Sequence, residues 1–98
     1  MADVKISITG GVITVDKNNV KVSKAAKEKV NWQCHDQTFT IESKPGKSPA
    51  FTVPATQQGT KLWTAELDLS NEPVGTIIAY SISAPGATTL DPDIEIVP

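Results

Sequence analysis

Residues 4–15 read VKISITGGVITV, and this stretch decides the fold of the chain. Apolar and polar side chains alternate from Val4 to Thr9, stop at the pair Gly10-Gly11, and alternate again from Ile13. A period of two is the spacing of a β-strand with one face in a core, and adjacent glycines favour a turn. The stretch therefore predicts two strands joined by a short turn.

The same alternation continues through most of the chain. It predicts further strands over residues 20–22, 30–35, 39–41, 63–69, 77–83 and 94–96. Turn signals separate these runs at the intervals of a two-sheet Greek-key sandwich of about seven to eight strands. Residues 23–29 break the pattern and predict a polar loop or helical turn, capped by Ser23. Residues 43–60 are rich in Pro, Gly, Ser and Thr, which predicts a long irregular connection.

Length and composition indicate one all-β domain, residues 1–98. The single cysteine, Cys34, excludes an intramolecular disulfide. The first residues lack a basic segment followed by an apolar run, so no secretory signal is visible and a cytoplasmic location is expected. No apolar run approaches the roughly 20 residues that span a bilayer, so no membrane span is expected.

The charge is small overall but unevenly distributed. Net charge is −2 and all nine basic residues are lysine, which argues against binding of nucleic acid. Residues 1–61 carry a net charge of +4, and residues 62–98 carry −6. Five lysines lie close together in sequence: Lys17, Lys21, Lys24, Lys27 and Lys29. A solvated face is the preferred interpretation of this group, and an anion-binding patch is the alternative.

Three short segments carry a resemblance to a known fold: residues 30–32, residues 38–41, and Tyr80-Ser81-Ile82 followed by a loop and a final strand. Together they resemble the cupredoxin fold, over most of the chain from Val4 onward. The ending, residues 90–96, is similar to small bacterial cupredoxin-like proteins that lack copper. A fibronectin type III or other immunoglobulin-like sandwich is the alternative, because it also places a Trp on one strand and a Tyr on a later one.

The resemblance implies where copper ligands would lie, and this chain lacks them there. The position of the first histidine falls on Gln37, and that of the cysteine falls on Ile82. The terminal loop, residues 83–93, contains no His, Cys or Met. A blue-copper site needs two imidazoles and a thiolate, whereas this chain has one His in total. We therefore expect no copper and no other cofactor.

Cys34-His35-Asp36 is the one cluster that suggests metal chemistry. Neighbouring residues on a strand point to opposite faces. Cys34 shares its parity with Trp32 and is expected in the core, so His35 is expected to face solvent. The preferred interpretation is a buried, inert thiol, and a copper or zinc site formed by Cys34 and His35 is the alternative. No set of catalytic residues is recognisable, so we do not expect an enzyme; a distributed acidic site would be the exception.

These observations favour a non-catalytic binding or structural module on a metal-free sandwich. Loops on a rigid sandwich commonly carry function, so the expected recognition surface is segment 43–60 with the loops 34–37 and 84–92 beside it. The candidate binding residues are Gln37, Pro45, Lys47, Pro49 and Phe51. The expected partner is a protein or small ligand that the sequence does not identify, or a second copy of the chain through an edge strand.

Overall fold

The computed structural model describes residues 2–46 and 50–98, which form ten β-strands and no helix. The strands are β1 (Ala2–Thr9), β2 (Val12–Val15), β3 (Asn19–Ser23), β4 (Lys29–Cys34), β5 (Thr40–Ser43), β6 (Thr52–Pro54), β7 (Thr56–Gln57), β8 (Trp63–Asp68), β9 (Ile77–Ser83) and β10 (Asp93–Val97). The expected all-β sandwich is confirmed. The count of seven to eight strands was too low, because β6 and β7 lie inside segment 43–60, which was expected to be irregular.

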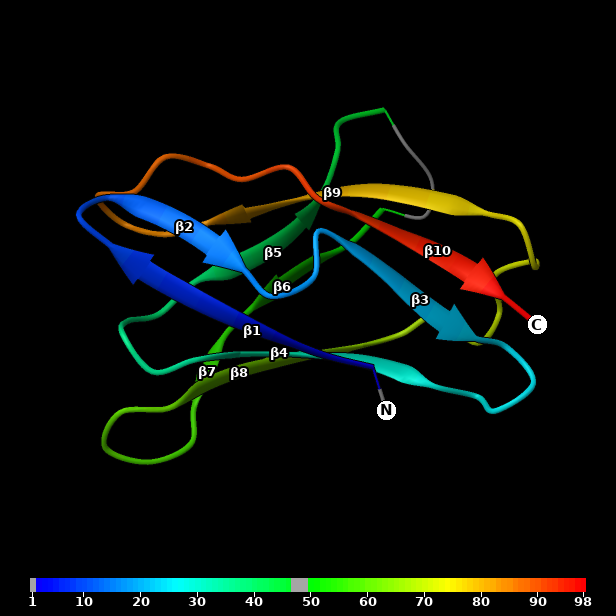
Figure 1. The fold of residues 1–98 in the computed structure, drawn as a ribbon, viewed down its shortest axis with the longest axis horizontal. Helices are drawn as coiled ribbons and strands as arrows, with labels where there is room; N and C mark the ends of the chain where they lie inside the picture. Colours follow the sequence, from blue (N-terminus) through cyan, green and yellow to red (C-terminus); the bar gives the residue numbers. More distant parts are fainter. Residues whose placement is uncertain (1, 47–49) are drawn as a thin grey trace.

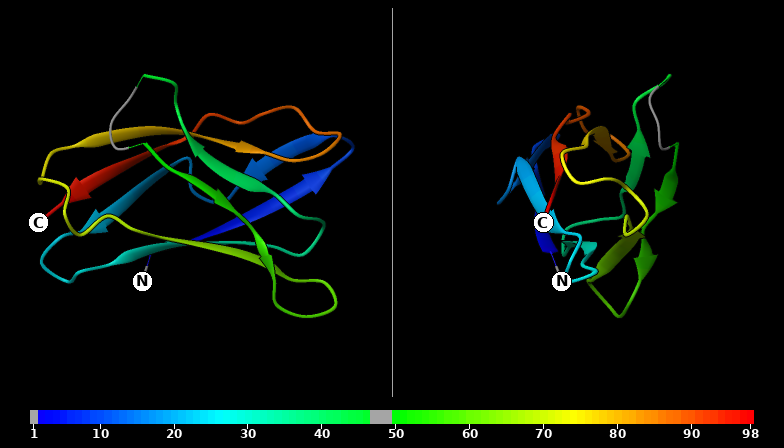
Figure 2. Two further views of the ribbon diagram at one scale, coloured as in Figure 1. Left: turned by 180° about the vertical axis from the view of Figure 1, so that it is seen from behind. Right: turned by 90° about the vertical axis from the view of Figure 1, so that its right-hand side faces the viewer.

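The strands form two five-stranded sheets packed face to face (Figures 1 and 2). Sheet A has the order β2-β1-β4-β8-β7, and sheet B has the order β3-β10-β9-β5-β6. Two pairs are parallel, β1 with β4 and β3 with β10, and the other pairs are antiparallel. The parallel pairs place strands side by side that are far apart in sequence.

The chain changes sheets along both long sides of the sandwich. Strand β2 lies at the edge of sheet A, and after three intervening residues β3 begins at the edge of sheet B. On the opposite side β6 belongs to sheet B and β7 to sheet A, with Ala55 alone between them. The Ala55 amide donates to the carbonyl of Phe39 at 2.9 Å, which ties this crossing to the loop before β5.

The predicted inward faces of four strands are the core. The buried positions on β1, β4, β9 and β10 include Val4, Ile6, Ile8, Val30, Trp32, Cys34, Ile78, Tyr80, Ile82, Ile94 and Ile96. Trp63, also expected inward, is only partly buried. It lies on β8 opposite Gln57 of the two-residue edge strand β7, where the sheet is narrow. Alternation thus predicts the core well within long strands and less well beside a short edge.

One aromatic pair joins the two sheets inside the core. The indole Nε1 of Trp32, on sheet A, donates a hydrogen bond of 3.1 Å to the hydroxyl of Tyr80, on sheet B. Their rings meet edge to face, with centroids 5.5 Å apart and planes at 63°. Both side chains have an exposed fraction of 0%, and burial raises the pKa of Tyr80 to about 12. The Tyr80 hydroxyl therefore bonds within the core.

The polar segment before β4 forms a tight turn, as expected for residues 23–29. The Ser23 hydroxyl accepts the amide of Ala26 at 3.2 Å, so the predicted capping role of Ser23 is confirmed. The Ser23 amide donates to the Glu28 carboxylate at 2.8 Å, and the Ser23 carbonyl accepts the Glu28 amide at 3.1 Å. The backbone groups of Ser23 at the end of β3 are therefore occupied.

Candidate functional site

Cys34, the last residue of β4, is in the core, and His35, the first residue after the strand, faces solvent, as the sequence predicts. Cys34 is fully buried in the core, and His35 is exposed. The Nδ1 atom of His35 lies 2.9 Å from the carbonyl oxygen of Lys61. A carbonyl can only accept, so Nδ1 carries a proton and donates, and in the neutral ring Nε2 is then the acceptor. The arrangement connects the end of β4 to the loop before β8.

Asp36 completes the hydrogen bonding of β1 beyond the end of β4. Its Oδ2 accepts the backbone amide of Ile8 at 2.8 Å. Strand β4 ends at Cys34, so no further β4 carbonyl is available for this amide. The carboxylate stands in for the missing strand partner and is partly neutralised by that hydrogen bond. Asp36 is therefore a structural cap, whereas the sequence suggested it as a third metal ligand.

Gln37 occupies the position where the resemblance implies the first copper ligand. Its side-chain Nε2 donates to the carbonyl of Pro85 at 3.0 Å. Pro85 follows β9, in the loop where the resemblance implies the remaining ligands. A hydrogen bond between a side chain and the backbone therefore links two loops that are 48 residues apart. Ile82, at the implied cysteine position, is fully buried in the core.

The loops that gather at this end of the sandwich come from three segments: residues 35–39, 58–62 and 84–90 (Figures 1 and 2). We call them the loop end. The contacts of His35 and Gln37 hold the first segment to the other two. Most side chains of these loops are exposed or half-buried. The loop end is thus a cross-linked surface.

Segment 43–60 is not a single loop. Its first described residues, 43–46 and 50–52, which we call the hairpin, lie at one end of the antiparallel pair β5–β6, and its residues 58–60 lie at the loop end. Because β5 runs between them, the hairpin and residues 35–39 lie at opposite ends of that strand (Figure 1). The hairpin therefore does not adjoin loop 34–37, whereas its Lys44 contacts Asp91 of segment 84–92. Of the candidates there, Pro45 is exposed and Phe51 half-buried, and Lys47 and Pro49 lie outside the described residues.

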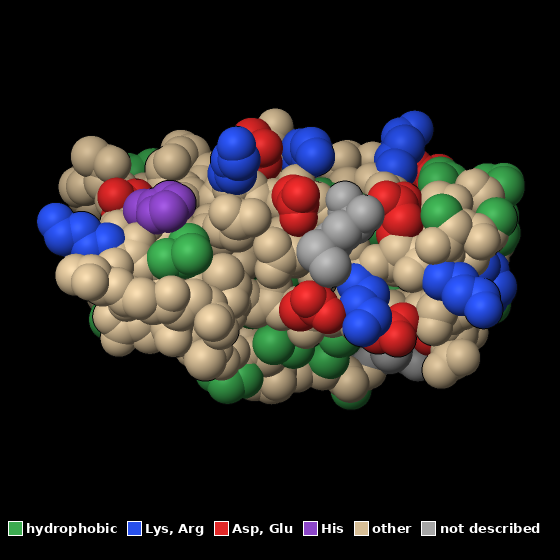
Figure 3. Space-filling view, turned by 90° about the horizontal axis from the view of Figure 1, so that it is seen from below, with side chains coloured by type: hydrophobic (Ala, Val, Ile, Leu, Met, Phe, Trp, Pro, Cys, Tyr) green, Lys and Arg blue, Asp and Glu red, His purple; other side chains and the backbone are tan. Residues whose placement is uncertain are grey.

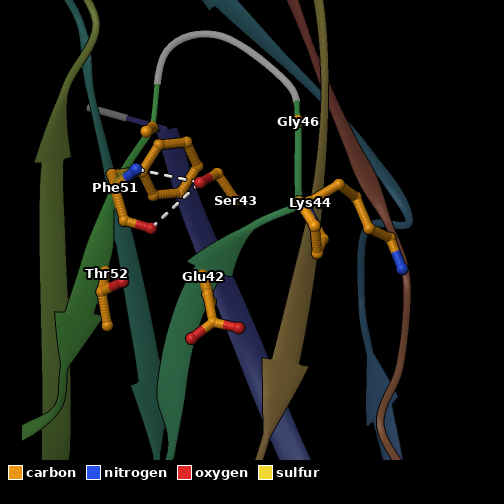
Figure 4. Close-up of a pocket in the computed structure, with 8 residues that line it drawn as sticks. Glu42, Ser43, Lys44, Gly46, Phe51 and Thr52 are labelled. Carbon is orange, nitrogen blue, oxygen red and sulfur yellow. Dashed lines mark hydrogen bonds between the residues drawn. The ribbon is translucent and has the colours of Figure 1, made fainter.

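The hairpin lines an open hollow of about 490 Å³ (Figure 4). The Ser43 hydroxyl closes its base, because it accepts the Phe51 amide at 2.9 Å and lies 3.2 Å from the Phe51 carbonyl. The Lys44 side chain turns away from the hollow toward the other side of β9, where its Nζ bonds to Asp91. The lysine that lines the hollow is therefore engaged elsewhere.

The contact between Lys44 and Asp91 was missed by sequence reasoning. Asp91 also accepts a hydrogen bond of 3.0 Å from the Ser81 hydroxyl. The hydrogen bonds from Lys44 and then from Ser81 lower the pKa of the Asp91 carboxyl. Ser81 was readable as an outward position of β9, but nothing local indicated that the hairpin and the loop before β10 meet above it. The contacts of Asp91 with Lys44 and Ser81 hold the C-terminal end of segment 84–92 against sheet B.

The five clustered lysines do not form one basic patch. Four of them contact an oxygen acceptor: Lys17 the Asp3 carbonyl, Lys21 the Glu95 carboxylate, Lys24 the Ser70 and Glu72 carbonyls, and Lys29 the Glu66 carboxylate. Figure 3 shows the side of the molecule that carries β4 and β8, where basic and acidic side chains are interspersed. The preferred interpretation of a solvated face agrees with this arrangement.

Three findings complete the description of the site. Among residues 2–46 and 50–98, no group of three or more His, Cys, Asp or Glu side chains is placed to hold a metal ion. The described part of the chain has no helix of the length and apolarity needed to cross a membrane. Comparison of the sequence with models of protein families and with curated proteins gives no match.

Proposed function

We propose that this chain is a non-catalytic interaction module on a cupredoxin-like sandwich without copper ligands, and that the loop end is its recognition surface. The two-sheet architecture is compatible with that fold. The observation that carries the proposal is the hydrogen bond from Gln37 to the Pro85 carbonyl. It joins the two loops that a metal would join in a copper protein, so the loops are held without one.

This contact and two others support a binding platform in preference to a reactive site. The side chains of His35, Asp36 and Gln37, which were considered as metal ligands, each form a hydrogen bond to another segment of the chain. A side chain that is used in this way keeps one orientation, which suits recognition, because a preorganised surface loses less entropy on binding. The fold alone does not imply a function, so the argument rests on these side chains.

The competing proposal is a copper or zinc site that uses Cys34 and His35. The full burial of Cys34 and the exposure of His35 argue against joint coordination, but the neutral ring of His35 offers Nε2 as a ligand atom. Titration of the full chain with Cu²⁺ or Zn²⁺, followed by native mass spectrometry, separates the proposals. We expect no stoichiometric metal adduct. A 1:1 adduct that disappears in Cys34→Ser or His35→Ala would replace our proposal with the metal site.

The recognition surface is testable by site-specific photo-cross-linking in cells. A photoreactive amino acid at the exposed positions Thr38 or Thr89 lies at the loop end, whereas one at Lys27 lies at the opposite end of the sandwich (Figure 1). We expect a discrete cross-linked partner from both loop-end positions and none from Lys27. Cross-links that form only from Lys27 would show that the binding surface lies elsewhere.

A further inference from the structure

The outer edge of sheet A is formed by β2. The Asp16 amide donates to the Lys5 carbonyl at 3.2 Å, and the register then pairs Ser7 with Thr14 in the same manner. Backbone groups alternate between the two sides of a strand. The N–H and C=O groups of Ile13 and Val15 therefore point away from β1, toward the open edge.

Segment 84–90, which we call the strap, lies along the first half of this edge (Figures 1 and 2). The Thr88 amide donates to the Gly11 carbonyl at 2.9 Å, and a single parallel β-bridge pairs Thr88 with Val12. The approach is close: a Cβ at Gly11 would lie 3.1 Å from the Gly86 carbonyl oxygen. The strap thus occupies the place of a sixth strand beside β2, over a short length.

Few bonds hold the strap in this position. Its end at Leu90 is anchored by two hydrogen bonds with Ile82, of 2.8 and 3.1 Å. In the described residues, its middle is tied to the rest of the molecule by the Thr88 bond and by the exposed bond from Gln37 to Pro85. Ala84, Ala87 and Leu90 of the strap pack against the core, whereas Pro85, Gly86, Thr88 and Thr89 are exposed. An exposed stretch that is held by few hydrogen bonds opens at lower free energy than the packed core. Gln37 is therefore the latch of the strap.

The other edge strands are protected by features of their own residues and do not depend on a covering segment. On β3, the Ser23 backbone groups are occupied by Glu28, and Lys21 adds a charge. On β6, the outward position Pro54 has no amide hydrogen to offer. Strand β7 has only two residues. Charge, proline and short length are the usual protections of an edge. Residues 12–15, in contrast, are uncharged and mostly β-branched.

From this comparison we infer that the strap is a removable guard, and that the partner accepted by the opened β2 edge is a second copy of the chain. An antiparallel pair of β2 strands about a two-fold axis at Thr14 places Ile13 opposite Val15 of the second copy. Both residues point their backbone groups outward, so the pair forms complete hydrogen-bonded rings. Val12 then faces Asp16, so no like charges oppose each other. This inference shares the Gln37–Pro85 hydrogen bond with the proposed function but concerns a different surface, the β2 edge, and its disulfide trap tests that edge alone.

A disulfide trap tests the inference. In the proposed pair, Thr14 faces its own copy at a non-hydrogen-bonded position, where the Cα atoms lie about 4.5 Å apart. That distance is within the range for a disulfide. Thr14→Cys is therefore expected to form a covalent dimer under mild oxidation, identified by mass spectrometry of the linked peptide. Thr52→Cys, also exposed but on the proline-guarded edge β6, is the matched control and is expected to stay monomeric.

The second experiment removes the hydrogen bond from Gln37 to Pro85. Adding Gln37→Ala to Thr14→Cys is expected to speed cross-linking roughly fivefold, the population change that loss of one ordinary hydrogen bond produces. Hydrogen exchange of the Thr88 amide in the Gln37→Ala variant, with folding checked by circular dichroism, is expected to rise by a similar factor.

Each contrary result removes one part of the inference. Unchanged exchange at Thr88 would show that Gln37 is not the latch. Faster exchange without faster cross-linking would show that a second copy is not the partner. Equal cross-linking of Thr14→Cys and Thr52→Cys would show that the β2 edge has no preference for its own copy.

Discussion

Replacing Tyr80 by Phe tests the bond that joins the two sheets inside the core. The change removes the hydroxyl that accepts the Trp32 indole N–H at 3.1 Å and leaves ring packing in place. Both residues have no exposed surface, so water does not replace the lost acceptor. A buried donor without a partner costs about 1–3 kcal/mol. This is a large share of the roughly 5–15 kcal/mol by which small domains are stable.

Equilibrium unfolding in urea, followed by tryptophan fluorescence and far-UV circular dichroism, measures the loss. With a slope of about 1–2 kcal/mol per molar urea for a small domain, the midpoint is expected to fall by roughly 1–2 M. The slope itself is expected to stay unchanged, because the same surface is exposed on unfolding.

A double-mutant cycle assigns the loss to this hydrogen bond. In a Trp32→Phe background no indole N–H is left to strand, so Tyr80→Phe is expected to cost about 1 kcal/mol less than in the natural sequence. Trp63 remains as the fluorescent reporter in that background. An equal cost of Tyr80→Phe in both backgrounds, or a cost below about 0.5 kcal/mol in the natural one, would refute the reasoning.

The same tyrosine predicts a loss of stability in alkali. Burial raises its pKa from 10.0 to about 12 in the folded protein, so the folded state retains a proton that the unfolded chain releases. The stabilising contribution is therefore complete below pH 10 and is lost as the pH rises toward 12. A shift of this size corresponds to about 3 kcal/mol. Urea titrations between pH 8 and 11 are expected to show a decline that is smaller in Tyr80→Phe.

Three further predictions follow from single contacts. The Cys34 thiol is buried, so a thiol reagent is expected to modify it slowly in the native protein and rapidly in urea; fast native modification would contradict its place in the core. Lys44→Gln is expected to raise the pKa of Asp91 back toward 3.8, because the Lys44 hydrogen bond is the main cause that lowers it; a titration by NMR measures this, and an unchanged value would show that the contact is absent in solution. Any stability that Asp91 adds is expected to be present above pH 3.8 and lost as the pH falls through its lowered pKa. Gly11→Ala is expected to lower the free energy of unfolding more than Gly10→Ala does, because Gly11 has φ +76° and a Cβ there would lie 3.1 Å from a backbone oxygen, whereas Gly10 has φ +58° and open space around it. The difference, obtained from urea unfolding, is expected to be about 1 kcal/mol or more. Equal losses in the two variants would argue against the close approach.

Alternation along the chain was enough to predict the faces of the strands. It placed Cys34 in the core and His35 outside, because successive side chains of a strand point in opposite directions whatever the strand pairs with. It also indicated the sandwich class, since packing two sheets face to face is one of the few ways in which half-buried strands cover their apolar faces. Alternation did not predict the strands β6 and β7 within segment 43–60. Both strands are short and lie at sheet edges, where Pro54 and exposed threonines are tolerated.

Tertiary structure decided which strands are neighbours, and with them the site. A period of two gives the face of a residue but carries no information about the partner strand, so the parallel pair β1–β4 was not readable. The contacts that define the loop end join residues far apart in the chain: Gln37 with Pro85, and Asp36 with Ile8. Local sequence sets a side chain's direction, and only the packing of two sheets sets which backbone group lies within its reach.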